Sequence, residues 1–151
     1  MAVSKKSPQI ARLIQHLEGR ELDAHYLGYF DCFNRQHYYD AHDVLEELWL
    51  TQRGLPNGLF YKGLIQFAGA FVHLQKNRLQ PAAALFKLAQ SQLEKYPPIH
   101  FRLDLQDVLA RVEWWIGRLE ESNYTSNPLT SSTAPQLRLL PENASQATAA
   151  P

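Results

Sequence analysis

The stretch YYDAHDVLEELW, from Tyr38 to Trp49, decides the fold of this chain. On a helical wheel of about 100° per residue, its apolar side chains share one continuous arc: Ala41, Val44, Leu45, Leu48 and Trp49. His42 lies inside one end of this arc, and Glu46 lies at its margin. The stretch therefore predicts an amphipathic helix that packs one face against other helices and carries two ionisable side chains beside that face.

Helical patterns continue on both sides of this stretch. Apolar residues recur at helical spacing in further segments, at about 10–17, 22–33, 59–75, 81–96 and 104–120. The segment LFYKGLIQFAGAFVHLQ (59–75) is apolar almost all round, which is typical of a helix in the middle of a bundle. No convincing strand pattern occurs. We predict an all-α fold, a single compact bundle of about five helices built on a helical hairpin.

The chain divides by composition into three parts. Residues 1–20 are expected to form an N-terminal helix or extension, and residues 21–122 the helical domain. Residues 123–151 are rich in Ser, Thr, Ala, Pro, Asn and Gln, and such a segment buries too little apolar area to offset its ordering entropy. We therefore expect a disordered tail. Its one apolar piece is LRLL (137–140), which could dock on the domain or on a partner.

Charge and cysteine content limit the partners. The 151 residues hold 15 Lys and Arg against 15 Asp and Glu, so no overall basic field attracts nucleic acid or an anionic membrane. No apolar run reaches the roughly 20 residues that cross a bilayer, and the first residues lack the apolar region of a signal peptide. Cys32 is the single cysteine, which excludes intrachain disulfides and multi-cysteine zinc sites. We expect a cytoplasmic protein that binds neither nucleic acid nor membranes.

A polar stripe interrupts the apolar segment 59–75. Lys62, Gln66, Gly69 and His73 fall on one narrow side of an otherwise apolar cylinder. Lysine and glutamine at such positions cost free energy unless they are paired. Glycine costs about 1 kcal/mol against alanine in a helix interior, which is tolerable where another group must come close. The economical arrangement places this stripe against the helix that carries His42 and Glu46.

One interpretation of these residues is purely structural. Lys62 would pair with Glu46 or Glu47, and His42 and Gln66 would satisfy each other's hydrogen bonds. The network would then fix how the two helices dock, with no ligand involved.

Two other interpretations involve chemistry. His42, Glu46 and His73 could bind a divalent metal ion, because a catalytic metal site normally uses three protein ligands and an open position. Without a metal, His42 polarised by Glu46 could act as an acid–base catalyst while Lys62 holds an anionic group. Nucleophilic catalysis is less favoured, because Cys32 lies among aromatic residues, where a thiol is usually inert. The sequence leaves these alternatives open.

Three stretches resemble a known family: FNRQHYYDAHDVLEELW (33–49), LFYKGLIQFAGAFVHLQKN (59–77) and AAALFKLAQSQLEKY (82–96). They are similar to the family of domains of unknown function numbered 309. That family shows an F-N-x-G-x-Y-x-x-A-H-E-x-L-E-x-x-W signature and a G-L-I-Q-x-A-x-A helix. The resemblance covers about Tyr29 to Tyr96. It implies a small all-helical fold and a cytosolic location, and it implies no activity.

The resemblance marks particular positions of this chain. They are Phe33, Asn34, Tyr38, His42, Leu45, Glu46, Trp49, Gly63 and Gln66. Asp43 replaces the usual glutamate after the histidine and keeps its charge. Gln36 stands where the signature has glycine. If that position needs a positive φ, either Gln36 carries backbone strain or the turn differs from that of the family.

These observations lead to an expectation about function. The best-supported role is a cytosolic binding or interaction protein with a polar cleft between helices, whose small-molecule ligand is unknown. The expected ligand-binding residues are Asn34, Tyr38, His42, Glu46, Trp49, Lys62, Gln66 and His73. The alternative is a small metal-dependent or acid–base hydrolase with His42 and Glu46 as its catalytic residues. A scaffold resembling tetratricopeptide repeats is a third interpretation, although the helical hairpin does not recur.

A homodimer or a protein partner is compatible with the many aromatic side chains. Trp114 and Trp115 are adjacent, so they point about 100° apart and cannot both face one core. One of the two is expected to cover a helix end, another subunit or the ligand pocket.

Overall fold

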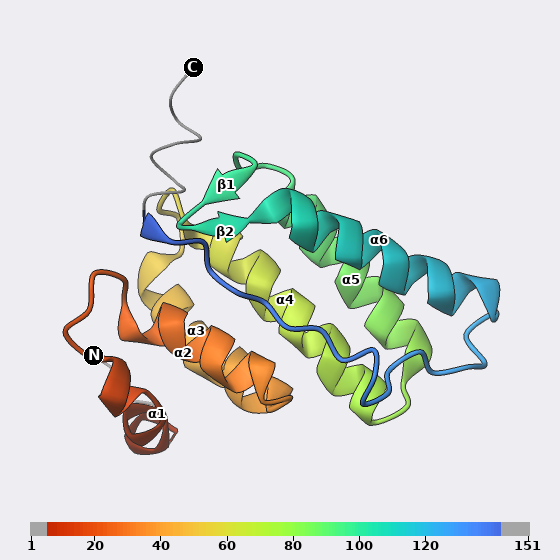
Figure 1. The fold of residues 1–151 in the computed structure, drawn as a ribbon, viewed down its shortest axis with the longest axis horizontal. Helices are drawn as coiled ribbons and strands as arrows, with labels where there is room; N and C mark the ends of the chain where they lie inside the picture. Colours follow the sequence, from red (N-terminus) through yellow and green to blue (C-terminus); the bar gives the residue numbers. More distant parts are fainter. Residues whose placement is uncertain (1–5, 143–151) are drawn as a thin grey trace.

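A computed structural model describes residues 6–142 of the chain. The fold is mostly helical, which confirms the all-α prediction (Figure 1). Six α-helices and one two-stranded hairpin are present among the described residues, where about five helices were predicted. The helices are α1 (Ser7–Ile14), α2 (Ala24–Asn34), α3 (Tyr38–Gln52), α4 (Gly58–Gln75), α5 (Leu79–Leu93) and α6 (Leu105–Glu121), and a 3₁₀ turn, Gln15–Leu17, follows α1.

Two helices begin at aspartates that accept hydrogen bonds from the first turn. The side chain of Asp23 accepts from the backbone N–H of His25 at 2.8 Å at the start of α2. The side chain of Asp104 accepts from the N–H of Asp107 at 3.1 Å at the start of α6. Aspartate suits these positions because its carboxylate satisfies N–H groups that have no partner within the helix.

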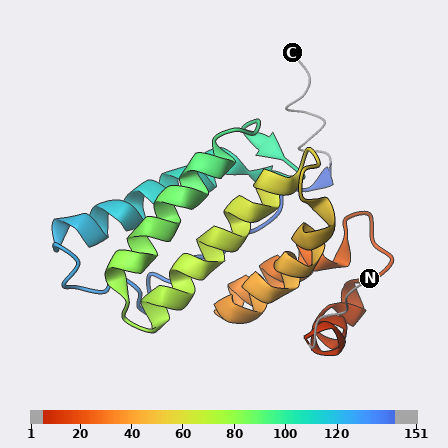
Figure 2. The same cartoon turned by 180° about the vertical axis from the view of Figure 1, so that it is seen from behind.

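Helix α4 lies between α3 and α5, in the position that its all-round apolar pattern predicts (Figure 2). Its inner side is packed with aromatic rings. The Phe67 ring stacks on Phe33 at 5.4 Å between centroids, and Phe71 meets Trp115 of α6 edge-on at 5.0 Å. Both phenylalanines of α4 are fully buried. The core of the bundle therefore lies beneath α4, and α4 presents one narrow side to solvent.

The adjacent tryptophans separate as expected. Trp115 is 2% exposed in the core, whereas Trp114 is 46% exposed on the outside of α6.

A short hairpin corrects the prediction that the chain has no strands. Ile99–His100 (β1) pairs antiparallel with Leu103–Asp104 (β2). Each strand has two residues, which is too short for an alternating pattern to show in the sequence. Phe101 and Arg102 form the turn with φ values of 47° and 60°. Consecutive residues with positive φ are the geometry of a tight hairpin turn, usually supplied by Asn and Gly, so the sequence carries no turn signal here.

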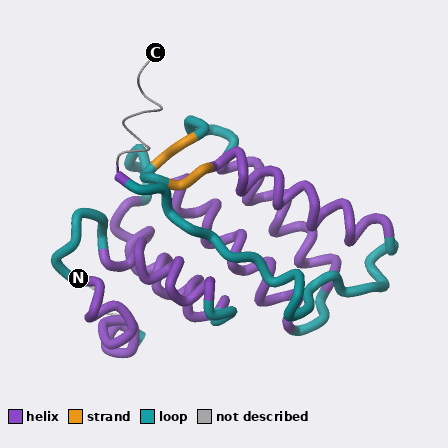
Figure 3. The backbone as a smooth tube through the Cα atoms, viewed as in Figure 1, coloured by secondary structure: helices purple, strands orange, loops and turns teal. Residues whose placement is uncertain are grey.

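The C-terminal segment (residues 123–142) corrects the prediction of a disordered tail from residue 123. It runs across the bundle in contact with helices and buries Leu137 to 2% exposure (Figure 3). The prediction relied on the scarcity of apolar residues in this segment. It was wrong because the Asn34 side chain of α2 binds the backbone of Leu137, a contact that does not depend on apolar composition. Residues 1–5 and 143–151, which belong to the predicted N-terminal extension and tail, lie outside the described residues.

The connector between α2 and α3 contains the strained residue expected from the family signature. Gln36 has a φ of 65°, a left-handed conformation in which a side chain other than that of glycine is disfavoured. This turn sets α3 antiparallel to α2. Among residues 6–142, no helix is both long and apolar enough to cross a bilayer.

Candidate functional site

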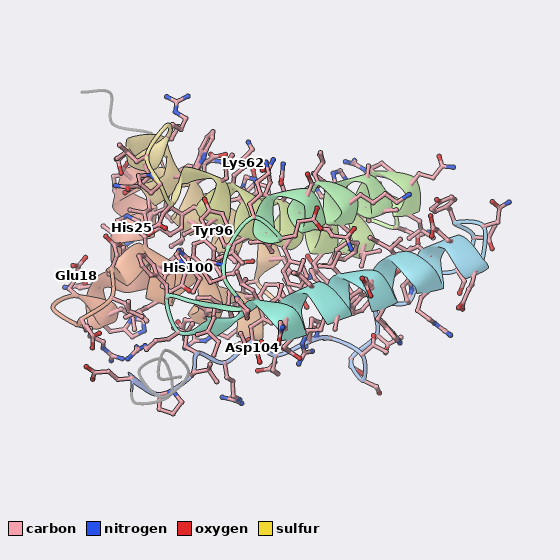
Figure 4. The ribbon with its side chains drawn as sticks, turned by 90° about the horizontal axis from the view of Figure 1, so that it is seen from above. Glu18, His25, Lys62, Tyr96, His100 and Asp104 are labelled. Atoms are coloured by element: carbon pink, nitrogen blue, oxygen red, sulfur yellow. The ribbon has the colours of Figure 1, made fainter. Side chains whose placement is uncertain are left out.

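The outer stripe, defined as Lys62, Gln66, Gly69 and His73, is the side of α4 that faces away from the core. Lys62, Gln66 and His73 are partly exposed, while most of α4 is buried. In Figure 4, Lys62 lies on the opposite side of the bundle from Asp104 and the C-terminal segment. The polar residues of α4 therefore reach a surface bordered by α3 and α5, and they are not enclosed within the bundle.

Gly69 lets two neighbouring helices approach α4 closely. A Cβ atom at this position would lie 3.1 Å from Leu85 Cδ1 of α5 and 3.8 Å from His42 Cδ2 of α3. Glycine at this point thus brings the imidazole of His42 against the outer stripe, as predicted.

A second contact fixes the alignment of α3 with α4. The Lys62 ammonium lies over the Trp49 ring, 4.3 Å from its centroid. Between antiparallel helices, the pairs His42–Gly69 and Trp49–Lys62 set one register, which brings Gln66 to the level of Glu46. The structure therefore places His42, Glu46 and Trp49 along one side of the outer stripe.

The polar partners differ from the predicted network. Lys62 contacts Trp49 and forms no ion pair with Glu46 or Glu47. The Nδ1 atom of His42 lies 3.1 Å from Asp43 Oδ1, on its own helix. Within residues 6–142, Glu46 forms no hydrogen bond or ion pair, so its carboxylate remains available to a ligand. The expected pairs of Lys62 with a glutamate and of His42 with Gln66 are absent from the described part of the chain.

Glu47 holds the N-terminal helix instead. Its carboxylate accepts a hydrogen bond from Ser7 Oγ at 3.0 Å and lies 3.1 Å from His25 Nε2. The other nitrogen of His25 contacts Asp23 at 2.9 Å. This cluster was not predicted, because its residues are far apart in the sequence and share no spacing pattern. The one local signal for it is Asp23, at the start of a helix.

Two buried polar atoms of the outer stripe have no hydrogen-bond partner. They are Gln66 Oε1 and His73 Nδ1. Burial lowers the pKa of His73 from its usual value, and the nearby charges of Arg78 and Lys76 lower it further. His73 is therefore neutral at physiological pH, with one nitrogen able to accept a hydrogen bond. Unpartnered buried polar atoms are uncommon in native proteins, and each costs free energy.

Asn34 and Tyr38, the remaining predicted ligand-binding residues, do not join the outer stripe. Tyr38 is fully buried between Phe33 and Phe71, its hydroxyl has no partner, and burial raises its pKa to about 12. Asn34 lies at the C-terminal end of α2, where its side chain bonds to the backbone of Leu137. A helical wheel could not distinguish these structural roles from ligand binding, because it does not show which neighbouring element covers each face of a helix.

The predicted metal ligands do not converge. Among the described residues, no three His, Cys, Asp or Glu side chains are arranged to hold a metal ion. His42, Glu46 and His73 therefore do not form the three-ligand set, because His73 lies about two helical turns along α4 from the level of Glu46. The Cys32 thiol is buried, and burial, followed by the charges of Asp40 and Asp31, raises its pKa to about 11. It remains a neutral thiol at physiological pH.

Comparison with known proteins adds one result. Residues 26–88 match the family model described as Domain of unknown function (DUF309). This part of the chain is similar to the DUF309 family. The match confirms the resemblance on which Asn34, His42, Glu46 and Trp49 were marked. No curated protein and no solved structure matches the chain.

The DUF309 match locates the outer stripe within the family. It extends from α2 into α5 and contains α3 and α4 entirely. Both sides of the contact between His42 and Gly69 therefore lie within the matched residues, and so does Asn34. The hairpin, α6 and the C-terminal segment lie outside the match.

Proposed function

We propose that this protein is a binding protein whose small polar ligand docks on the outer stripe of α4. The single observation that carries this proposal is that Gln66 Oε1 and His73 Nδ1 are buried without partners on the same helix side. A ligand that donates hydrogen bonds to these atoms would replace the water that they lost on folding.

The surroundings of the stripe support a ligand with both polar and planar groups. Trp49 offers an aromatic face beside the Lys62 ammonium, an arrangement that suits a flat or charged group. Glu46 adds an unpaired carboxylate at the level of Gln66, which accepts hydrogen bonds. We therefore infer a small molecule that carries hydrogen-bond donors and at least one planar group.

A thermal-shift panel of small carboxylates, phosphates, amides and nucleobases tests the proposal, with hits confirmed by calorimetric titration. A compound that binds the wild-type chain should bind Gln66→Ala at least about tenfold more weakly, which is about 1.4 kcal/mol. Gln75→Ala is the matched control, because Gln75 lies on the same helix outside the stripe and is exposed. Equal loss in both variants, or no binding by any compound, would count against the proposal.

Acid–base catalysis is a second candidate, favoured by the contact between His42 Nδ1 and Asp43 at 3.1 Å. A carboxylate at Nδ1 orients an imidazole and leaves Nε2 to exchange a proton with a substrate. Asp43 thus takes the place predicted for Glu46. If the chain is a hydrolase, p-nitrophenyl acetate turnover should fall in His42→Ala and persist in His37→Ala. Repeating the assay after chelator treatment tests the metal-dependent form of the same candidate.

We also infer a cytoplasmic protein that does not bind nucleic acid, from its balanced charge and single cysteine. A homodimer or a protein partner remains a proposal, supported by the half-exposed Trp114. Sedimentation analysis of the purified chain over a range of concentrations tests for the homodimer.

A further inference from the structure

The C-terminal segment crosses the face of the bundle opposite the outer stripe, as an extended chain between α2 and α6 (Figures 1 and 3). Hydrogen bonds hold it at both ends. The Asn127 side chain donates to the Leu74 carbonyl at 2.6 Å, at the end of α4. The backbone N–H of Leu140 donates to the Arg102 carbonyl at 2.7 Å, in the hairpin turn. The segment therefore lies along the domain and is held by hydrogen bonds, although it forms no strand of its own.

The Asn34 side chain both donates a hydrogen bond to the backbone of this segment and accepts one from it. Its side-chain Nδ2 donates to the Leu137 carbonyl at 2.8 Å, and its Oδ1 accepts from the Leu137 N–H at 2.7 Å. The Asn34 backbone carbonyl also accepts a bond from Gln136 Nε2 at 2.8 Å. One amide group therefore satisfies both backbone groups of Leu137, which is what a neighbouring β-strand does for an extended peptide.

The side chains of the segment alternate between domain and solvent. Pro135 and Leu137 are buried, while Gln136 and Arg138 are exposed. An extended chain alternates its side chains in this way, so backbone bonds hold the segment while alternate side chains fill pockets on the domain.

The face of the bundle that holds the C-terminal segment has unfilled space beside Pro135. A cavity of about 270 Å³ is lined by Trp114, Trp115, Arg111, Thr133 and Pro135. Trp114 is nearly half exposed at this place. This face therefore has room for a side chain larger than proline at the position of Pro135.

The face that binds the segment draws on two parts of the chain, because Arg102, Trp114 and Trp115 lie outside the DUF309 match. Asn34 and Leu74 lie within the DUF309 match, and residues 123–142 lie outside it. We propose that the face containing Asn34 is a peptide-binding site of this protein. Its occupant is the chain's own segment 133–141, TAPQLRLLP, bound in cis as an exchangeable ligand. The site recognises an extended peptide with a leucine at the position of Leu137, two residues after a proline or larger apolar residue.

The test uses a fluorescent peptide of residues 133–141 and full-length chains. In the Leu137→Ser variant, the chain's segment 133–141 loses its buried leucine side chain. The segment should then bind the face more weakly and leave the site open to the added peptide. Fluorescence anisotropy should show the peptide binding this variant at least about tenfold more tightly than the wild-type chain, where the tethered segment competes. Arg138→Ser is the matched control, because Arg138 is exposed, and it should bind the peptide as weakly as the wild type.

Two further variants test the role of each contact. Adding Asn34→Ala to Leu137→Ser should abolish peptide binding, and a peptide with serine in place of leucine should not bind. Circular dichroism checks that each variant keeps its helices. Equal peptide binding to wild-type and Leu137→Ser chains, or binding unaffected by Asn34→Ala, would overturn the proposal.

Hydrogen exchange on the wild-type chain gives a measurement that does not depend on the folding of Leu137→Ser. The amide of Leu137 should be protected, and an excess of unlabelled peptide should accelerate its exchange while amides of α4 stay protected. Failure of the peptide to accelerate this exchange would show that the segment is a fixed part of the fold. A wild-type dimer that dissociates when the peptide is added would show that the segment of a second copy occupies the site, and would overturn the assignment in cis.

Discussion

The two sides of α4 differ in how completely their groups are satisfied. On the inner side, Phe67 and Phe71 contact aromatic rings from α2, α5 and α6 and are fully buried. On the outer stripe, Gln66 Oε1 and His73 Nδ1 are buried without hydrogen-bond partners. One helix therefore provides packing on one side and unmatched polar groups on the other. The contrast shows that the inner side is the packed side of the helix, and it is the basis of the proposal that a ligand binds the outer stripe.

Phe71→Ala should cause the largest loss of stability. The ring is fully buried and contacts Phe33, Phe86 and Trp115 edge-on at 5.0 to 5.4 Å between centroids. Removing it leaves a cavity, which should lower the free energy of unfolding by about 3–5 kcal/mol. Urea denaturation measures the change. Leu59→Ala, at an exposed position of the same helix, should change stability by less than about 0.5 kcal/mol. Similar losses in both variants would remove the distinction between the two sides.

Gly63→Ala and Gly69→Ala compare the same change at two buried glycines of α4, of which only Gly69 lies on the outer stripe. A Cβ atom at Gly63 would lie 2.8 Å from both Leu93 Cγ and Cδ2, so the buried Leu93 side chain must shift. We expect a loss of about 1–3 kcal/mol. At Gly69 the nearest atom is the terminal Cδ1 of Leu85, at 3.1 Å, which can rotate away. There the gain in helix propensity, about 1 kcal/mol, should offset the crowding. Thermal unfolding of both variants measures the difference, and a larger loss at Gly69 would contradict it.

Gln66→Leu should leave stability unchanged or raise it by less than about 1 kcal/mol, because it removes a buried oxygen that has no partner. Gln75→Leu is the matched control on the same helix. The Gln75 side chain donates to the Gln36 carbonyl at 3.1 Å, so its loss should cost about 0.5 kcal/mol. Chemical denaturation of the two variants measures the change. A clear destabilisation by Gln66→Leu would mean that its side chain already has a structural role.

The pH dependence of stability should show the smallest effect. Because the pKa of His73 is lowered in the folded state, the unfolded chain binds a proton more readily than the folded chain. The stability contributed by neutral His73 is complete above about pH 6.5 and is lost as the pH falls below that value. Burial lowers the pKa of His100 as well, which adds in the same direction.

Unfolding free energies measured from about pH 7 to about pH 5 should therefore decline less steeply in His73→Asn than in the wild type. His37→Asn, at an exposed position, is the control. A wild-type slope that His73→Asn leaves unchanged would show that His73 is not desolvated in solution.

The helices themselves were largely predictable because their signals are local. The apolar arc of Tyr38–Trp49, the breakers Gly54 and Pro56, and the all-round apolar character of 59–75 lie within a few residues of the elements that they define. The strain at Gln36 was expected from the family signature and is present as a φ of 65°. Local spacing also placed His42 beside the outer stripe, because Gly69 gives space to its ring.

The choice of polar partners was not predictable, because each side chain had several candidates within reach. Lys62 contacts Trp49 and not Glu46, and His42 contacts Asp43 on its own helix. Glu47 turns to Ser7 and His25, which lie far away in the sequence. Such preferences depend on the relative rotation of packed helices, which a helical wheel of one segment does not contain.

The sequence by itself determined an all-helical domain, the identity of its central helix and the polar side of that helix, because periodicity in apolar residues sets which face is buried. Only the tertiary structure decided which groups meet: the register of α3 against α4, the unpartnered atoms of Gln66 and His73, and the binding of Leu137 by Asn34. The residues that meet in this way are far apart in the chain: 69 − 42 = 27 positions separate His42 from Gly69, and 103 positions separate Asn34 from Leu137. Contacts at such separations arise from packing in three dimensions and leave no periodic trace along the chain.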